Sequence, residues 1–164
     1  MEKPTKHYSG RQESVVSDFL GWNRVSASGA RPFDKGDIKS DMWLCECKTH
    51  THKNKRYKIS HFDWSKIVIE ATSCMKRPVM VVDAGVQEVK YEVCIVEKKF
   101  CDNIKHVENS ADNPFFRVSR TVTTFDASWT RIMLDGEFAT EIKIGDTELY
   151  VMPLTLFKEK VMES

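Results

Sequence analysis

The sequence predicts an α/β protein in which a mixed β-sheet is flanked by helices. Over the first hundred residues, segments with helical apolar spacing alternate with short strand-like runs, in the order helix, strand, strand, strand, helix, strand. The chain has 164 residues, of which 41% are hydrophobic, enough to bury one hydrophobic core. We therefore predict a single domain over residues 1–164, with a core of about 8–100 and a β-rich extension of about 101–164.

The first predicted helix covers residues 9–21, and Gly21 provides its C-terminal stop. Its apolar residues have helical spacing: Val15, Val16, Phe19 and Leu20. Glu13 shares a side with two of them, which favours a position along the buried edge. The alternative is an exposed glutamate in the first turn, where it would interact favourably with the helix dipole.

A short strand at 23–27 and a hairpin over 36–48 follow, and the hairpin carries the most informative residues. Glu46 and Lys48 lie two positions apart on a strand and point to the same face, and a partner strand carrying Asp37 would add a second carboxylate. The strand is apolar on both faces until its end, which is typical of a central buried strand. A buried Glu and Lys need partners, although the same spacing also occurs on solvated hairpins.

Two carboxylates and an ammonium group suit metal-dependent phosphodiester hydrolysis. Mg²⁺ prefers oxygen ligands and is usually held by one or two carboxylates together with substrate phosphate oxygens. A neighbouring lysine can orient the attacking water and stabilise the charge that develops on phosphorus. This pattern predicts a Mg²⁺-dependent nuclease.

The stretch from about residue 8 to 84 resembles the PD-(D/E)xK nuclease superfamily, and within it the small Holliday junction resolvases of archaea and bacteriophages. The order of several pieces carries the resemblance: Arg11-Gln12-Glu13, Leu20-Gly21, residues 24–30, Lys35-Gly36-Asp37, Glu46-Cys47-Lys48-Thr49, residues 63–71 and residues 77–82. Gly36 stands where the superfamily name has Pro. The resemblance implies a restriction-endonuclease-like core.

The resemblance also implies roles for individual residues. Asp37 and Glu46 would bind the metal, Lys48 would serve the nucleophilic water, and Glu13 would be a further ligand; Asp41 or Asp34 is an alternative to Asp37. The metal would be Mg²⁺, with Mn²⁺ as a substitute. The substrate would be branched double-stranded DNA, cut during recombination or replication by a homodimer whose two active sites match the twofold symmetry of the junction.

Two basic regions are the candidate DNA contacts. The loop region contributes Arg24, Ser28, Arg31 and Lys35, and a basic segment over 49–58, predicted to be a loop or hairpin tip, contributes Lys53, Lys55, Arg56 and Lys58. Tyr57 offers a stacking face for a base. Scattered charges on solvated loops are the alternative interpretation.

The distribution of charge supports a nucleic-acid partner better than the net charge of +1 does. Residues 1–60 hold 12 Lys or Arg against 7 Asp or Glu, whereas residues 101–164 hold 7 against 11. The basic part is the part that carries the predicted metal site, where phosphates would approach.

The remaining elements are predicted from local patterns. Ser60 begins a helix that ends near Lys76, with an apolar stripe formed by Trp64, Ile67, Val68, Ala71 and Met75. Strands follow at 79–82, as one long strand at 86–100, at 115–125 and at 131–134, after a loop at 101–114. A hairpin turns at Gly145-Asp146, between 142–144 and 149–152, and a closing helix covers 154–162.

Several classes of protein do not fit this sequence. It has no apolar run long enough to span a membrane and no signal-peptide pattern, and its five cysteines show no zinc-type CxxC pairs. We expect a cytoplasmic protein, in the host cytoplasm if it is viral. Without a P-loop or a nucleophile elbow, an NTPase or serine hydrolase is not expected. The alternatives left open are a restriction-like or repair endonuclease of the same fold, and a non-catalytic module that binds nucleic acid or protein.

Overall fold

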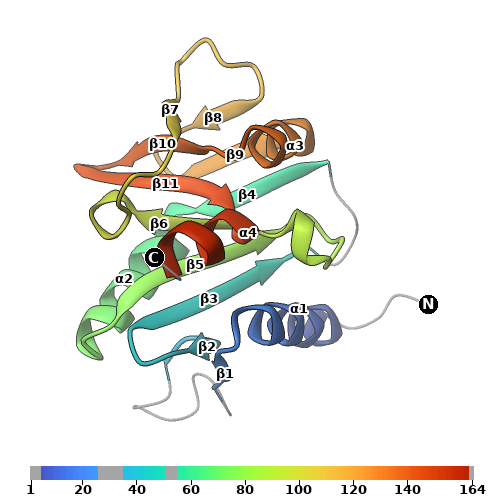
Figure 1. Cartoon of the computed structure of the whole chain (residues 1–164), viewed down its shortest axis with the longest axis vertical. Coiled ribbons are helices and arrows are strands. Elements are labelled where there is room, and N and C mark those ends of the chain that lie inside the picture. The colour runs from blue at the N-terminus through green and yellow to red at the C-terminus, as the bar shows by residue number, and fades with distance from the viewer. Residues whose placement is uncertain (1–4, 26–34, 51–54, 163–164) are drawn as a thin grey trace.

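The computed structural model describes residues 5–25, 35–50 and 55–162, which form an α/β fold with two sheets (Figure 1). The larger sheet has eight strands in the order β1-β2-β3-β5-β6-β11-β10-β7, and the smaller has three in the order β4-β9-β8. The helices are α1 (Thr5–Leu20), α2 (His61–Ser73), α3 (Ala127–Gly136) and α4 (Leu154–Phe157). The strands of the larger sheet are β1 (Asn23–Arg24), β2 (Ile38–Lys39), β3 (Trp43–Thr49), β5 (Arg77–Asp83), β6 (Val93–Glu97), β7 (His106–Glu108), β10 (Ala139–Ile144) and β11 (Thr147–Pro153). Those of the smaller sheet are β4 (Arg56–Ser60), β8 (Phe116–Val118) and β9 (Val122–Asp126). The α/β class and the mixed sheet flanked by helices are confirmed.

The centre of the larger sheet is built as the apolar runs predict. Strand β3 pairs antiparallel with β2 and parallel with β5, and β3, α2 and β5 form a crossover connection. Six of the seven residues of β5 are buried, and Trp43, Leu44 and Cys45 of β3 are buried as well. The start of α2 is also confirmed, because the Ser60 side chain caps the helix by accepting a hydrogen bond from the backbone N–H of Asp63, at 3.3 Å.

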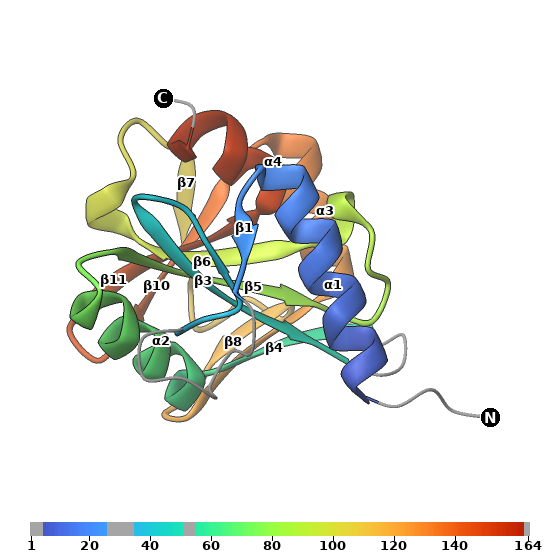
Figure 2. The same cartoon turned by 90° about the horizontal axis from the view of Figure 1, so that it is seen from below.

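Helices cover both faces of the larger sheet. One core cluster joins α1 and α4 to one face, where Val16, Trp43 and Phe157 meet. The other joins α2 and the smaller sheet to the opposite face, where Leu44, Ile67 and Phe125 are buried. Figure 2 shows the larger sheet between α1 and α4 on one side and α2 with β4 on the other. Strand β3 is therefore covered on both faces over its first half.

The predicted extension is continuous with the core. The predicted hairpin around Gly145-Asp146 is present as β10 and β11, and β11 pairs with β6, so the C-terminal strands extend the same sheet. The closing helix is α4, followed by a π-helical turn over Lys158–Met162.

Three predicted elements were wrong. The segment 86–100, predicted as one long strand, is instead β6 flanked by two short 3-10 helices (Val89–Tyr91 and Lys98–Phe100). All five residues of β6 are buried, so the alternation of apolar and polar residues in this segment does not come from a single strand with one exposed face. The segment 131–134 lies inside helix α3, which begins at the N-cap Asp126. The predicted strand at 115–125 is a hairpin of β8 and β9.

Two further details differ. The basic segment at 49–58 is not loop throughout, since β4 begins at Arg56 and buries Tyr57 and Ile59 against the smaller sheet. Helix α2 ends at Ser73, and Met75 is 94% exposed at a positive φ of 56° instead of extending the apolar stripe.

Candidate active site

The structure brings Asp37, Glu46 and Lys48 together at the β2–β3 hairpin. The register pairs Ile38 with Cys45, so Asp37, one residue before β2, lies level with Glu46 on the neighbouring strand. Asp37 Oδ2 accepts a hydrogen bond from the backbone N–H of Cys47 at 2.8 Å, and Lys48 Nζ lies 3.0 Å from Glu46 Oε1. The juxtaposition that the hairpin pattern predicts is therefore present.

Gly36 allows the chain to enter this arrangement. Its φ is +69°, and a Cβ at this position would lie 2.8 Å from Leu44 Cγ and 3.1 Å from the carbonyl oxygen of Cys45. A residue with a side chain would meet both backbone strain and a clash with β3. The backbone N–H of Asp37 then bonds to the Cys45 carbonyl at 2.8 Å, which fixes the acid against the strand.

Burial is the largest influence on the pKa of both carboxylates. The pKa of Asp37 is raised by burial, against the lowering effect of the Cys47 N–H, and the charge of Glu13 raises it further. The pKa of Glu46 is also raised, first by burial and then by the charge of Asp37. Burial lowers the pKa of Lys48, but the Glu46 carboxylate outweighs it and the net shift is upward. The site thus holds two crowded carboxylates beside a lysine that stays charged.

This donor set fits a hard divalent cation. The pKa values of both carboxylates are raised, first of all by burial, so a nearby positive charge would stabilise their ionised forms, and Mg²⁺ is commonly held by one or two carboxylates plus phosphate oxygens. Within the described ranges, no three His, Cys, Asp or Glu side chains lie close enough to form a complete metal site. Asp37 and Glu46 are the pair that could hold the ion.

Glu13 approaches this pair but has a partner of its own. Its Oε2 lies 2.9 Å from the Arg24 guanidinium, which also donates to Ser14 Oγ at 3.0 Å. The Glu13 side chain is 21% exposed, on the edge of α1 rather than fully outside. Arg24, predicted as a DNA contact, is thus tied to α1, and Glu13 lies close enough to Asp37 for its charge to raise the pKa of Asp37.

The alternatives to Asp37 as a metal ligand were Asp41 and Asp34. Asp41 is exposed in the turn between β2 and β3, where its carbonyl oxygen accepts a hydrogen bond from Lys76. The strand register places Asp37 beside Glu46 and leaves Asp41 at the turn end of the hairpin. Asp34 lies outside the described residues, as do the predicted DNA contacts Ser28, Arg31 and Lys53.

An open pocket of about 340 Å³ adjoins the site on the side of Lys48. Its lining joins the ends of β3, β4 and β5 with the start of α2: Lys48, Thr49, His50, Lys58, Ser60, Asp63 and Asp83. Lys58 is exposed on β4 and lines this pocket together with Lys48, although the two are ten residues apart in sequence. Lys58, predicted as a DNA contact, thus lines the same pocket as Lys48, together with Asp63 and Asp83.

The other described DNA-contact candidates lie near the start of β4 or just before the β2–β3 hairpin. Lys55 and Arg56 are exposed at and before the start of β4, and Lys35 is half-buried just before Gly36. Tyr57 cannot stack on a base, contrary to expectation. Its ring is 2% exposed and stacked on Phe125, and its hydroxyl donates to the Tyr91 carbonyl at 2.6 Å, because β4 alternates inward and outward residues.

Sequence reasoning missed two buried polar residues behind the site. Gln12, on α1, donates from Nε2 to the main-chain carbonyl of Lys48 at 3.0 Å and to Glu92 Oε2 at 3.1 Å. Glu92 is 0% exposed, and burial raises its pKa to about 9. Gln12 belongs to the Arg11-Gln12-Glu13 piece of the resemblance, but that piece assigned it no role. Its contacts span 36 and 80 positions, so local patterns gave no signal for them beyond a polar residue within a helical apolar stripe.

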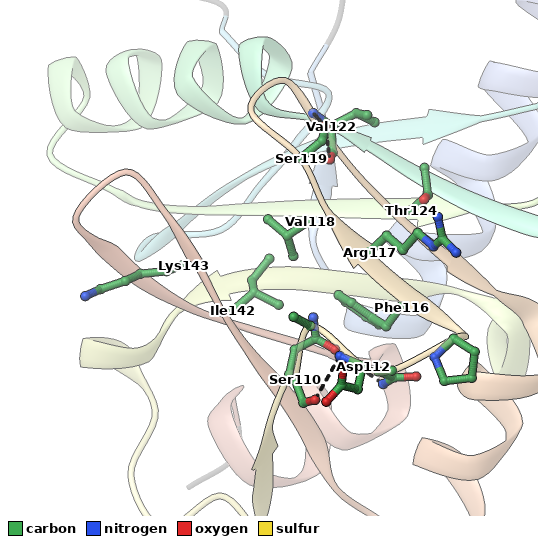
Figure 3. Close-up of a pocket in the computed structure, with 14 residues that line it drawn as sticks. Ser110, Asp112, Phe116, Arg117, Val118, Ser119, Val122, Thr124, Ile142 and Lys143 are labelled. Carbon is green, nitrogen blue, oxygen red and sulfur yellow. Dashed lines mark hydrogen bonds between the residues drawn. The ribbon is translucent and has the colours of Figure 1, made fainter.

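A larger hollow than the pocket beside Lys48 lies elsewhere. It has about 870 Å³ and is lined by the segment leading into β8, the β8–β9 hairpin and β10 (Figure 3). Its lining includes Phe116, Arg117, Ile142 and Lys143, and Asp112 is the acidic residue among those described around it. Because it offers no paired carboxylates, we place the candidate active site at Asp37, Glu46 and Lys48.

Comparisons with known proteins add no family to these observations. No protein-family model matches the chain, and neither the curated proteins nor the solved structures include a match. In the described residues, no helix is both long and apolar enough to cross a membrane.

Proposed function

We propose that the protein is a Mg²⁺-dependent, structure-specific endodeoxyribonuclease that cuts branched DNA, most simply a Holliday junction resolvase with a restriction-endonuclease-like core. The observation that carries the proposal is the convergence of Asp37, Glu46 and Lys48 at the end of a buried strand, with Glu46 and Lys48 at 3.0 Å. The connection order α1, β1, β2, β3, α2, β5, interrupted only by β4, supports it.

Each residue has a role consistent with its surroundings. Asp37 and Glu46 would hold Mg²⁺, and the charge of Glu13 adds to the negative potential there. The ion, when bound, would act as a Lewis acid toward the scissile phosphate. Lys48 is 45% exposed while Glu46 is 16% exposed, so the ammonium reaches toward solvent, where it could orient water and stabilise the developing negative charge.

DNA would approach over the basic face of β4 and the adjoining pocket. Lys58 lines this pocket with Lys48, and Arg56 is exposed two residues earlier on the same strand. Phosphate contacts of this kind position the duplex without reading its sequence. A homodimer would present two such sites to the two opposed strands of a junction.

The test is cleavage of a labelled four-way junction beside a matched linear duplex, with Mg²⁺, Mn²⁺ or EDTA. Glu46→Gln and Lys48→Ala are expected to bind the junction with wild-type affinity in EDTA and to lose cutting by at least ~100-fold. The chain offers a matched control pair in Glu88 and Lys90, which have the same two-residue spacing but lie 3.9 Å apart and are both exposed. Glu88→Gln and Lys90→Ala should cut normally.

The outcomes separate the candidate functions. Cutting of linear duplex as fast as of the junction would favour a restriction-like or repair endonuclease of the same fold. Junction binding without cutting in either metal would favour a non-catalytic nucleic-acid-binding module, for which the closed Glu46–Lys48 and Glu13–Arg24 ion pairs are the supporting observation. Site variants that cut like the wild type would contradict the proposed site.

A further inference from the structure

A buried glutamine connects helix α1 to the main chain of the proposed catalytic lysine. Gln12 is 0% exposed, and its Nε2 lies 3.0 Å from the carbonyl oxygen of Lys48. A carbonyl oxygen can only accept a hydrogen bond, so the amide nitrogen and not the amide oxygen must face it. The same nitrogen lies 3.5 Å from the Val81 carbonyl on the neighbouring strand, so the side chain sits where β3 and β5 run in parallel.

Glu92 completes the arrangement from the other side. Its Oε2 accepts from Gln12 Nε2 at 3.1 Å, and its main-chain carbonyl accepts from the backbone N–H of Leu154, at the start of α4. The two amide protons of Gln12 are shared among these acceptors, so the Gln12 amide keeps a single orientation. The oxygens Gln12 Oε1 and Glu92 Oε1 are buried without partners in the described structure, so neither residue is held there by a fully satisfied network of its own.

The location of this contact is what gives it significance. Strand β3 is buried from Trp43 to Cys45, whereas Lys48 and Thr49 form its last two residues, next to the open pocket. On the far side of β3, Asp37 and Gly36 hold the hairpin. On the side of helix α1, the Gln12 amide contacts the main chain of Lys48. It therefore fixes the backbone position from which the Lys48 ammonium group projects.

We propose that Gln12 is a positioning residue. Its amide, oriented by Glu92, holds the main chain of Lys48 in the position from which the Lys48 ammonium group reaches the Glu46 carboxylate. The inference rests on the proposed nuclease function, because positioning has a catalytic meaning only if Lys48 acts on the phosphate. Groups that orient an active-site residue through a hydrogen bond typically affect activity by about 10- to 100-fold when removed. Gln12 itself touches neither metal nor DNA in this scheme.

The experiment compares three variants of the full chain. Gln12→Met keeps the length of the side chain but removes both donor protons, and Gln12→Asn withdraws the amide by one methylene. Ser17→Ala is the matched control, since Ser17 is also buried on α1 and donates to a carbonyl, that of Trp22 at 2.6 Å, which is not part of the proposed site. Junction cleavage is measured as kcat and KM, and junction binding as Kd in EDTA.

We expect Gln12→Met and Gln12→Asn to lower kcat about 10- to 100-fold, with the Kd for the junction within about twofold of the wild type. A residue with a purely structural role would lower the fraction of folded protein without this split, as Ser17→Ala should. Hydrogen–deuterium exchange over residues 43–49 supplies a second readout that needs no nuclease activity: it should rise in the two Gln12 variants and stay unchanged in Ser17→Ala.

Each result has a defined reading. Wild-type kcat in both folded Gln12 variants would overturn the inference, as would unchanged exchange over 43–49. If Gln12→Met does not fold, Gln12→Asn decides. If the wild type itself cuts no DNA, the proposed function fails separately, and the exchange measurement still decides whether Gln12 holds this end of β3.

Discussion

Replacing Glu92 with glutamine is expected to make the protein more stable, by an amount that grows with pH. Glu92 is 0% exposed just before β6, and burial raises its pKa to about 9 from an ordinary value of 4.5. At neutral pH the folded protein therefore keeps this side chain protonated, whereas the unfolded chain releases the proton. Glutamine has a similar shape and no proton to release, so it avoids this penalty.

The magnitude follows from the difference between the two pKa values. Because the folded pKa is the higher one, the wild type is most stable below pH 4.5 and loses stability up to about pH 9, where the folded state also ionises. The loss is about 1.4 kcal/mol per pH unit, which amounts to about 3 kcal/mol at pH 7 and about 6 kcal/mol at pH 9. The Glu92→Gln variant should lack this contribution, so its stability relative to the wild type should rise with pH by these amounts, apart from a constant offset of about 1 kcal/mol from its altered hydrogen bonding.

The groups around Glu92 support this sign. Asp83 on β5 raises the pKa of Glu92 through its negative charge, and the donor Gln12 on α1 lowers it by less. Cys47 on β3 and Tyr57 on β4 also feel the charge of Glu92, and the pKa of each is itself raised, so neither supplies a positive charge. Gln12 is thus the neighbour that favours an ionised Glu92, and its effect is smaller than those of burial and of Asp83.

The assay is urea-induced unfolding of wild type and Glu92→Gln at pH 5, 6, 7 and 8, with the free energy of unfolding extrapolated to water. Glu97→Gln, at the end of β6, is the control for replacing a carboxylate that has a cationic partner, because the Glu97 carboxylate lies 2.9 Å from Lys99 Nζ. A difference between wild type and Glu92→Gln that stays constant from pH 5 to 8 would refute the argument that Glu92 is buried as a neutral acid.

Three further predictions test other parts of the structure. Gly36→Ala should lower the free energy of unfolding by about 2 kcal/mol or more, because φ is +69° and the new Cβ would lie 2.8 Å from Leu44 Cγ; denaturant unfolding that matches the wild type would show that the hairpin adopts another turn. Lys58→Ala should weaken junction binding in EDTA and reduce the slope of log affinity against log salt by about 0.9, and an unchanged slope would remove Lys58 from the DNA surface. Asp126→Ala should lower stability by about 1 kcal/mol, since Asp126 Oδ1 accepts from the Ser128 N–H at 2.9 Å at the start of α3; thermal unfolding at the wild-type temperature would contradict this capping role.

Local patterns in the sequence determined the parts of the fold that depend only on residues close together in the chain. The apolar runs of β3 and β5, the turn at Gly145 and the cap at Ser60 were read correctly because their causes lie within a few residues. The pairing of Asp37 with Glu46 belongs to this group as well, since a hairpin places its partners by register alone.

Only the tertiary structure decided what depends on contacts between distant segments. Helix α3 stands where a strand was expected at 131–134, capped by Asp126 and packed against β11 with Met133 buried, and Tyr57 became a core residue when β4 paired with β9. The Gln12 amide reaches Lys48 across 36 positions and Glu92 across 80, and the neutral state of Glu92 follows from its complete burial. Burial is a property of the packed chain, so no pattern of neighbouring residues could have specified it.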